Sequence, residues 1–305
     1  MGLNVQALAD FNNQVAGELL VRSVYAGSTM EYITIKEGVK YQEPINLMDV
    51  DLVIQNGTCV STPSGSLEFT QRNITVTPRT SFDGICLKDM DKKYLGISAL
   101  EPGSYSETFA MAAAYGDLLV NQFQKSNDAY LWNVNNGLRA LTSGSAPVNS
   151  IGVVIPAAIT GSAFTSANAL TTIDTMIESL NADVADRDDL TVFMSVANFR
   201  KYVSALRTAN SFYFDPNSIT NRGGILDMMY PFQNVRVVGT SGLTGSDRII
   251  LAPAKQIVAG TDLLSDFSEF QMWYDINSDQ LKHRISTKLG VQVAYPEYIV
   301  SNARA

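Results

Sequence analysis

The residue types that most often carry chemistry in proteins are scarce in this sequence. The single histidine, His283, lies inside the strand-like run 281–285, and no second imidazole exists to complete a metal site or a histidine-based triad. The two cysteines, Cys59 and Cys86, form no Cys-x-x-Cys pair, so neither a disulfide framework nor a thiolate metal site is indicated. We therefore expect His283 to be a structural strand residue and the chain to occupy a reducing compartment.

Two acidic clusters, at 89–91 and 186–189, are the next candidates for cation binding. Neither carries the alternating oxygen ligands, central glycine and terminal glutamate of a calcium loop. Both are predicted to be solvated turns. The sequence therefore predicts no metal-binding residue.

The glycine-rich segment 239–245 follows a predicted strand and superficially resembles a phosphate-binding loop. No Lys-Ser/Thr pair closes the motif, and residues 246–248 lead into another strand, so no helix N-terminus would face an anion. A β-hairpin is predicted here instead.

A basic and aromatic segment at 199–207 could stack on nucleic-acid bases. Its apolar members Phe199, Val203 and Leu206 follow helical spacing, which predicts that they face a core. The net charge of −8 and a pI near 4.7 also disfavour a protein that neutralises phosphates. The sequence thus predicts no catalytic residue, no cofactor-binding residue and no cofactor, and the chain is not expected to be an enzyme. A site built only from distant carboxylates remains an alternative.

The composition is that of a folded protein with a neutral, polar surface. The 305 residues are 46% hydrophobic but only 17% charged, against about 25% in ordinary domains. Such a surface favours contact with other subunits, because neutral polar groups cost less to desolvate than charges. The long uncharged stretch 140–173 is interrupted by Pro147 and Pro156, so no segment reaches the roughly 18–20 apolar residues that span a bilayer. A soluble protein is expected.

The elements that would position these residues can be read from periodicity. Residues 1–25 predict a short helical arm, and 30–79 a long β segment with strands at 32–35, 50–54 and 74–77. A capping box at Ser104 and Glu107 predicts the start of a helix over 105–135, about 45 Å long, with Gly137 ending it.

The second half of the sequence alternates between helical and strand patterns. The periodicity predicts helices at 170–184 and 198–209 and strands at 190–194, 235–238, 249–251, 267–276, 281–287 and 291–300. This alternation predicts a mixed α+β fold.

This order of elements resembles that of the HK97-type major capsid proteins of tailed bacteriophages, over nearly the whole chain. The motifs that carry the resemblance are the strand-to-helix step at 193–199, the strands 230–238 and 249–253, the Gly-Thr-Asp turn at 260–262, and the segment 288–296. The stretch from 69–72 to 86–88 is also similar to capsid proteins of phages that infect Bacteroidetes, including crAss-like phages.

The resemblance implies an α+β, HK97-like capsid fold with a defined domain order. The implied units are an N-terminal arm at 1–29, an extended β-hairpin called the E-loop at 30–80, a peripheral domain with the spine helix (104–136) and the start of the axial domain at 81–209, the axial domain at 210–262, and a return through the peripheral domain at 263–305.

The implied function is self-assembly into the hexamers and pentamers of an icosahedral shell that encloses double-stranded DNA. The implied location is the virion, after assembly in the cytoplasm of the host bacterium. The implied partners are other copies of the chain, a separate scaffolding protein and a portal, and the presence of decoration proteins is left open. No sequence-specific DNA binding and no membrane are expected.

We also expect an N-terminus close to Met1 in the virion and no covalent crosslinks, although Lys36 and Lys40 are available. The alternatives are another phage structural protein, of the tail or decoration class, and a carboxylate-based enzyme.

Overall fold

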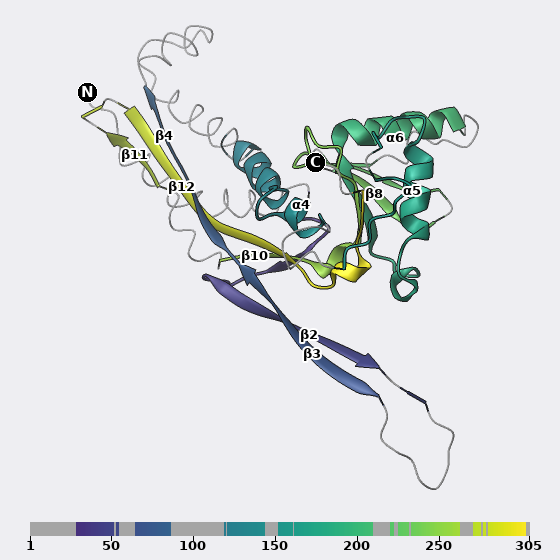
Figure 1. The fold of residues 1–305 in the computed structure, drawn as a ribbon. Coiled ribbons are helices and arrows are strands. Elements are labelled where there is room, and N and C mark those ends of the chain that lie inside the picture. Colours follow the sequence, from purple (N-terminus) through teal and green to yellow (C-terminus); the bar gives the residue numbers. More distant parts are fainter. Residues whose placement is uncertain are drawn as a thin grey trace.

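The structure is a computed structural model that describes residues 29–51, 53–54, 65–86, 119, 121–143, 152–160, 162–209, 220–222, 225–231, 233–262, 271–275, 277–278 and 280–302. Figure 1 shows a body in which one sheet is covered by helices, a second, elongated sheet beside it, and a long two-stranded hairpin that projects away from both. The fold is α+β, as predicted.

The elongated sheet is built around one long strand. Its members are β1 (Thr34–Lys36), β10 (Ile257–Thr261), β12 (Gln280–Val293), β11 (Gln271–Asp275) and β4 (Thr77–Cys86). β12 pairs antiparallel with β4, β10 and β11, and only β1 pairs parallel, with β10. Strand β12 therefore connects the two ends of this sheet.

The continuity of β12 corrects the expectation of separate strands at 281–287 and 291–300. Gly290 does not interrupt the strand, because it pairs with Gly260 of β10 and the backbone at Thr75 crosses directly over it. A Cβ atom at Gly290 would lie 2.1 Å from the Thr75 carbonyl oxygen. Close backbone approach, rather than a turn, explains this glycine. The strand predicted at 291–300 is not continuous either. After β12 ends at Val293, the chain forms the 3₁₀ turn η7 (Pro296–Tyr298) and then the short strand β13 (Val300–Ser301).

The second sheet has the order β13, β9 (Ile250–Pro253), β5 (Leu190–Ser195), β8 (Arg236–Thr240), β7 (Ile225–Met229) and β6 (Thr220–Arg222). β5 pairs parallel with β8 on one side and antiparallel with β9 on the other. The hairpin predicted at 239–245 is therefore wrong. Strands β8 and β9 do not pair, because β5 lies between them, and the glycine-rich segment is a turn that leads across β5.

Helices α5 (Ala169–Glu178) and α6 (Val196–Ala209) pack against this second sheet (Figure 1). Ile173 and Met176 of α5 are fully buried in the same core as Val192 of β5 and Val237 of β8. The helix predicted at 170–184 ends six residues earlier, at Glu178. The chain then forms the 3₁₀ turn η3 (Ala182–Val184), in which the Asn181 side chain accepts a hydrogen bond from the backbone N–H of Asp183.

A helix packs beside the elongated sheet. It is described at residues 121–131 and ends at Leu131. The prediction that it continues to 135 and is ended by Gly137 is wrong. Asn133 starts a turn, accepting hydrogen bonds from the backbone N–H groups of Asn135 (2.7 Å) and Gly137 (3.1 Å). Gly137 instead precedes the short helix α4 (Leu138–Leu141). Residues 1–28 of the arm predicted at 1–29, and the predicted helix start near 104, lie outside the described residues.

The projecting hairpin consists of β2 (Gln42–Asp51) and β3 (Ser66–Thr75), which pair antiparallel along their whole length. These strands are longer than those predicted at 50–54 and 74–77, and β2 begins eight residues earlier than expected. Since β1 and β4 belong to the elongated sheet, the part that projects is 42–75.

Candidate assembly surface

The residues singled out as possible sites take structural roles wherever the structure describes them. His283 lies in β12 with 2% of its surface exposed, as predicted for a strand residue, and burial lowers the pKa of its imidazole. In the 186–189 turn, the Asp189 carboxylate pairs with Arg187 at 2.7 Å, and this hydrogen bond lowers the pKa of Asp189. The cluster at 89–91 lies outside the described residues. Within the described ranges, no group of three or more His, Cys, Asp or Glu side chains could hold a metal ion.

The basic and aromatic segment at 199–207 faces the core, as its spacing predicted. Phe199 and Leu206 are almost fully buried under α6. In the described part of the chain, no helix is both long and apolar enough to cross a bilayer.

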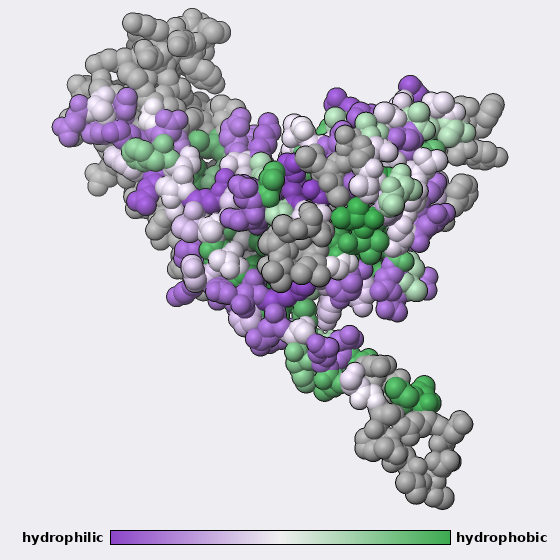
Figure 2. All heavy atoms as spheres, viewed as in Figure 1, coloured by the Kyte–Doolittle hydropathy of each residue, from purple (hydrophilic) through white to green (hydrophobic). Residues whose placement is uncertain are grey.

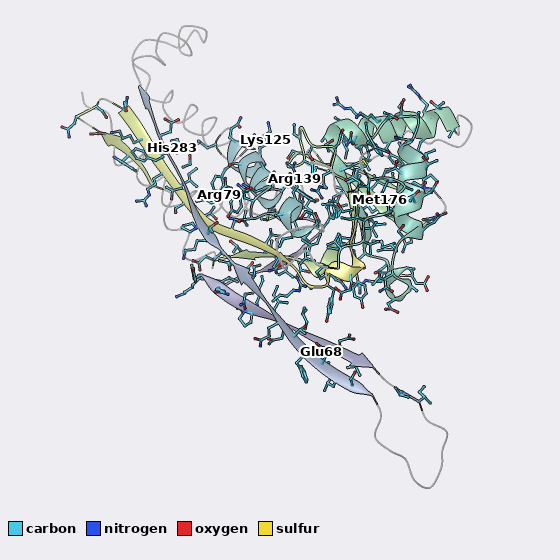
Figure 3. The ribbon with its side chains drawn as sticks, viewed as in Figure 1. Glu68, Arg79, Lys125, Arg139, Met176 and His283 are labelled. Atoms are coloured by element: carbon cyan, nitrogen blue, oxygen red, sulfur yellow. The ribbon has the colours of Figure 1, made fainter. Side chains whose placement is uncertain are left out.

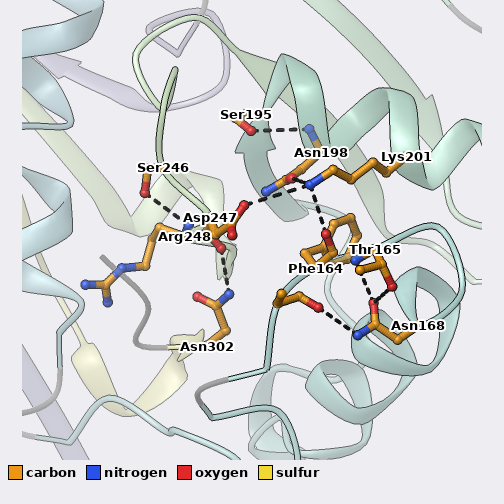
Figure 4. Close-up of polar contacts among 11 residues, drawn as sticks. Phe164, Thr165, Asn168, Ser195, Asn198, Lys201, Ser246, Asp247, Arg248 and Asn302 are labelled. Atoms are coloured by element: carbon orange, nitrogen blue, oxygen red, sulfur yellow. Dashed lines mark hydrogen bonds and ion pairs between the residues drawn. The ribbon is translucent and has the colours of Figure 1, made fainter.

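A polar cluster at the N-terminal end of α6 is also structural (Figure 4). The Lys201 ammonium donates to the Phe164 carbonyl and to the Asn198 side-chain oxygen, each at 2.9 Å, and lies 4.0 Å from Asp247. The hydroxyl oxygen of Ser195 accepts from the Asn198 backbone N–H, as a helix cap does. These contacts fix α6 to its neighbouring loops and do not pair a nucleophile with a base.

The base of the hairpin is fixed to the body. A small buried cluster lies where β3 of the hairpin meets β4 of the elongated sheet; its members are Val39, Ile74, Val76 and Val258. The Gln292 side chain donates to the Asn73 carbonyl at 3.0 Å, and the hydroxyl of Tyr295 donates to the Met48 carbonyl at 3.3 Å. The direction in which the hairpin projects is therefore determined by the subunit itself.

One face of the hairpin exposes large apolar side chains. Met48 pairs with Phe69 and Val50 pairs with Leu67, so these four side chains share a face. Their exposed fractions are 57%, 70%, 54% and 55%, respectively. Figure 2 shows hydrophobic spheres along this projection. We call these four residues the apolar hairpin face.

The opposite face places two like charges against each other. Asp49 and Glu68 are directly opposed across the strands, and both are exposed. Figure 3 shows Glu68 on the projecting hairpin. Directly opposed like charges destabilise a strand pair. An isolated two-stranded hairpin is at best marginally stable in water. The outer half of the hairpin thus has two features that cost free energy in the isolated subunit. Burial against a neighbour would offset the exposure of the apolar side chains, and a cationic group on a neighbour would offset the opposed carboxylates.

Sequence reasoning located this segment but did not identify its apolar hairpin face. The signal is present in the sequence, because apolar residues recur at 48 and 50 and again at 67 and 69 with the period of two that places side chains on one face. The pairing register of β2 and β3 places residue 48 opposite 69 and residue 50 opposite 67. Only this register shows that the four side chains form one patch.

Comparison with known proteins connects this architecture to capsids. No protein-family model and no curated protein sequence matches the chain. Among solved structures, a chain of the procapsid of satellite phage P4, which includes the size determination (Sid) protein, aligns with a TM-score of 0.57 at 9% identity, over 95% of this chain and 91% of that chain. A capsid chain of the empty GTA particle aligns with a TM-score of 0.55 at 12% identity over 90% and 89%. A chain of Gordonia phage Cozz aligns with a TM-score of 0.55 at 11% identity over 90% and 85%. The chain therefore has the fold of phage capsid proteins, as the resemblance of its sequence predicted.

Proposed function

We propose that the chain is the major capsid protein of a tailed phage, a structural subunit without catalytic activity that assembles into the hexamers and pentamers of an icosahedral shell around double-stranded DNA. The observation that carries this proposal is the apolar hairpin face on a projection whose direction the subunit fixes. The shared fold with capsid and procapsid chains supports it.

In this proposal the segment 30–80 is the E-loop, with the hairpin 42–75 as the part that lies over a neighbouring subunit. The helix that includes 121–131 is part of the spine helix. The six-stranded sheet with α5 and α6 corresponds to the axial domain, which begins within 81–209 and continues through 210–262. The elongated sheet belongs to the peripheral domain, to which 263–305 returns. Two short strands cross these bounds, because β10 joins the elongated sheet and β13 joins the six-stranded sheet. The shell would form in the host bacterial cytoplasm with a separate scaffolding protein and a portal, and would become part of the virion.

The energetics favour a neighbour at the apolar hairpin face. Complete burial of a Val, Leu, Phe or Met side chain contributes about 1.5–3 kcal/mol, and each of these four still has about half of its surface to bury. In a ring built from one repeated heterologous contact, each subunit gives one hairpin and receives one. The same burial is therefore repeated at every interface around the ring.

The experiment is assembly of a variant with a polar hairpin face. The fourfold variant Met48→Ser, Val50→Thr, Leu67→Thr, Phe69→Ser should keep its fold, because all four side chains are exposed in the subunit. We expect the unmodified protein to form shells, tubes or sheets by electron microscopy and to sediment as large particles, and the variant to sediment as single subunits or small rings. Circular dichroism would show that both are folded.

The matched control changes exposed residues on the opposite hairpin face, Thr70→Ser and Glu68→Gln. It should assemble as the unmodified protein does. Shells formed by the polar variant as readily as by the control would show that the hairpin is not an intersubunit arm. Dispersed monomers of the unmodified protein at all concentrations, with and without a scaffolding protein, would contradict the capsid proposal itself.

A further inference from the structure

Two arginines lie near the C-terminal end of α4, because Arg248 donates to the carbonyl oxygen of Thr142, the residue that follows this helix. Arg139 is on α4, and Arg248 precedes β9 by two residues. Arg248 is buried, with 6% of its surface exposed, and Arg139 is half-buried. Burial and, second, the nearby charge of Arg139 lower the pKa of Arg248 to about 10. The Arg248 guanidinium remains positively charged at neutral pH.

The hydrogen bonds made by these guanidinium groups are few. One terminal nitrogen of Arg248, Nη1, donates to the Thr142 carbonyl at 3.2 Å and to the Ser301 hydroxyl at 3.3 Å. Within the described residues, the Nε atoms of both arginines are buried without a hydrogen-bond acceptor, and neither arginine forms an ion pair. A guanidinium has five N–H donors, so most of the donor capacity of Arg248 is not used by neutral protein groups.

The charged neighbours lie on the other side of the main chain. Figure 4 shows the Arg248 guanidinium directed away from Asp247, Lys201 and Asn302. The Asp247 carboxylate is instead 4.0 Å from the Lys201 ammonium. The carboxylate adjacent in sequence therefore does not compensate the buried charge of Arg248.

Two other arginines in the described residues do have a carboxylate partner. Arg187 pairs with Asp189 at 2.7 Å, and Arg236 lies 3.5 Å from Asp227. Burying a cation without a counter-charge costs several kcal/mol, and a second cation beside it adds repulsion. Arginine cannot escape this cost by losing its proton. An anion that accepts hydrogen bonds from both groups would offset this cost.

We propose that Arg139 and Arg248 form a binding site for a phosphate group, which would accept hydrogen bonds from the unused donors of both guanidinium groups. Two positive charges match a dianion, and the fork of N–H donors on each guanidinium fits phosphate oxygens in a bidentate manner. The limited exposure of Arg248 favours a small ion over a bulky ligand. This site is independent of the hairpin and of the capsid proposal.

The test compares thermal unfolding of the full chain in chloride and in inorganic phosphate at equal pH and ionic strength, with sedimentation confirming the same assembly state in both. Phosphate should raise the melting temperature by roughly 4–8 °C at one hundred times its dissociation constant. The variant Arg139→Gln should melt at or above the unmodified protein in chloride, because one of two repelling charges is gone. Phosphate should not raise the melting temperature of this variant. The unmodified protein should therefore have the higher melting temperature in phosphate, although it does not in chloride.

Arg207→Gln is the matched control, since Arg207 is exposed at the end of α6, and it should keep the full response to phosphate. An equal response in Arg139→Gln would mean an adventitious ion only and would overturn the site. No response of the unmodified protein, or a response to acetate but not to phosphate, would also overturn it. Titration with a short DNA duplex decides the source of the group: Arg139-dependent binding of the duplex assigns it to nucleic acid, and binding of inorganic phosphate alone assigns it to the free ion.

Discussion

Asp128 joins three segments that are distant in the sequence. Its buried carboxylate accepts hydrogen bonds from the backbone N–H and hydroxyl of Thr29 on one oxygen and from the Ser241 hydroxyl and Gly242 N–H on the other. In Asp128→Asn, an amide NH₂ would face donors on one side, so two charge-assisted bonds are lost. We expect the free energy of unfolding to fall by about 3 kcal/mol, measured by urea denaturation.

The control for this change is Asp186→Asn, an exposed carboxylate in a turn, which should leave the free energy of unfolding unchanged. Equal stability of Asp128→Asn and the control would show that the carboxylate does not hold these segments together.

His283 provides a second prediction, because it is the only histidine in the chain. Burial lowers its pKa in the folded state, with a smaller opposing effect from Asp83. As the pH falls below about 6.5, the ordinary value for histidine, the unfolded chain takes up a proton before the folded chain does. The free energy of unfolding should therefore decrease on acidification.

The measurement is a set of denaturant titrations between pH 7 and 5, with His283→Gln expected to show a flatter dependence on pH. An NMR titration of the single imidazole measures the same pKa directly. A folded-state pKa above 6.5 would reverse the predicted sign.

These residue-scale roles were only partly predictable from sequence. His283 was predicted as a strand residue because the period of two around it is local. The partners of Asp128 lie about one hundred residues away along the chain, and no local pattern indicates which distant donors will meet a given carboxylate. The same holds for Arg139 and Arg248.

At the scale of elements, Gly290 is the position where one backbone crosses another. Replacing it with alanine would place a Cβ atom 2.1 Å from the Thr75 carbonyl oxygen, which belongs to backbone and cannot move aside cheaply. We expect Gly290→Ala to lower the free energy of unfolding by about 1–3 kcal/mol, the usual cost of overpacking.

Gly84→Ala is the companion variant, because its Cβ would meet only side-chain atoms and no backbone, namely Gln280 Oε1 at 2.9 Å and Lys282 Cγ at 3.2 Å. It should be close to neutral in the same denaturation experiment. A neutral Gly290→Ala would mean that the strands can separate at the crossing without cost.

Elements with strong local signals were predicted best. The buried strand at 190–194 and the helix at 198–209 are confirmed nearly to their ends. Two errors occur where a tertiary contact decides, at Gly290 and at 239–245, where β5 separates two strands that are neighbours in the sequence. A third occurs at the Asn133 turn, where the Asn133 side chain accepts from a backbone N–H two residues later and the helix ends.

For the whole molecule, the order of elements was more informative than any single motif, because it led to the capsid fold that the structural comparison shows. The boundaries between the proposed units cannot be read from the sequence, since residues 190–195 and 250–253 pair in one sheet although more than fifty positions separate them.

The covalent state of the assembled particle is a prediction at this scale. The Lys36 ammonium pairs with Glu43 at 2.7 Å and donates to the Pro44 carbonyl. Both partners of this ammonium belong to the same chain, so the amine is held at its own subunit and is not presented to a neighbour. Denaturing gels of assembled particles should therefore show one band near 33.2 kDa. A ladder of multiples would mean that another lysine, such as Lys40, reacts.

The length of the β4–β12 pairing has a mechanical consequence. Ten successive residue pairs, from Thr77 with Leu289 to Cys86 with Gln280, join two antiparallel strands whose hydrogen bonds lie perpendicular to the chain. A pull that slides β12 lengthwise past β4 loads all of these bonds in shear at once, whereas a pull across one end opens them one by one like a zipper. The elongated sheet should therefore be stiff against stretching along its strands and weak against peeling from its tip.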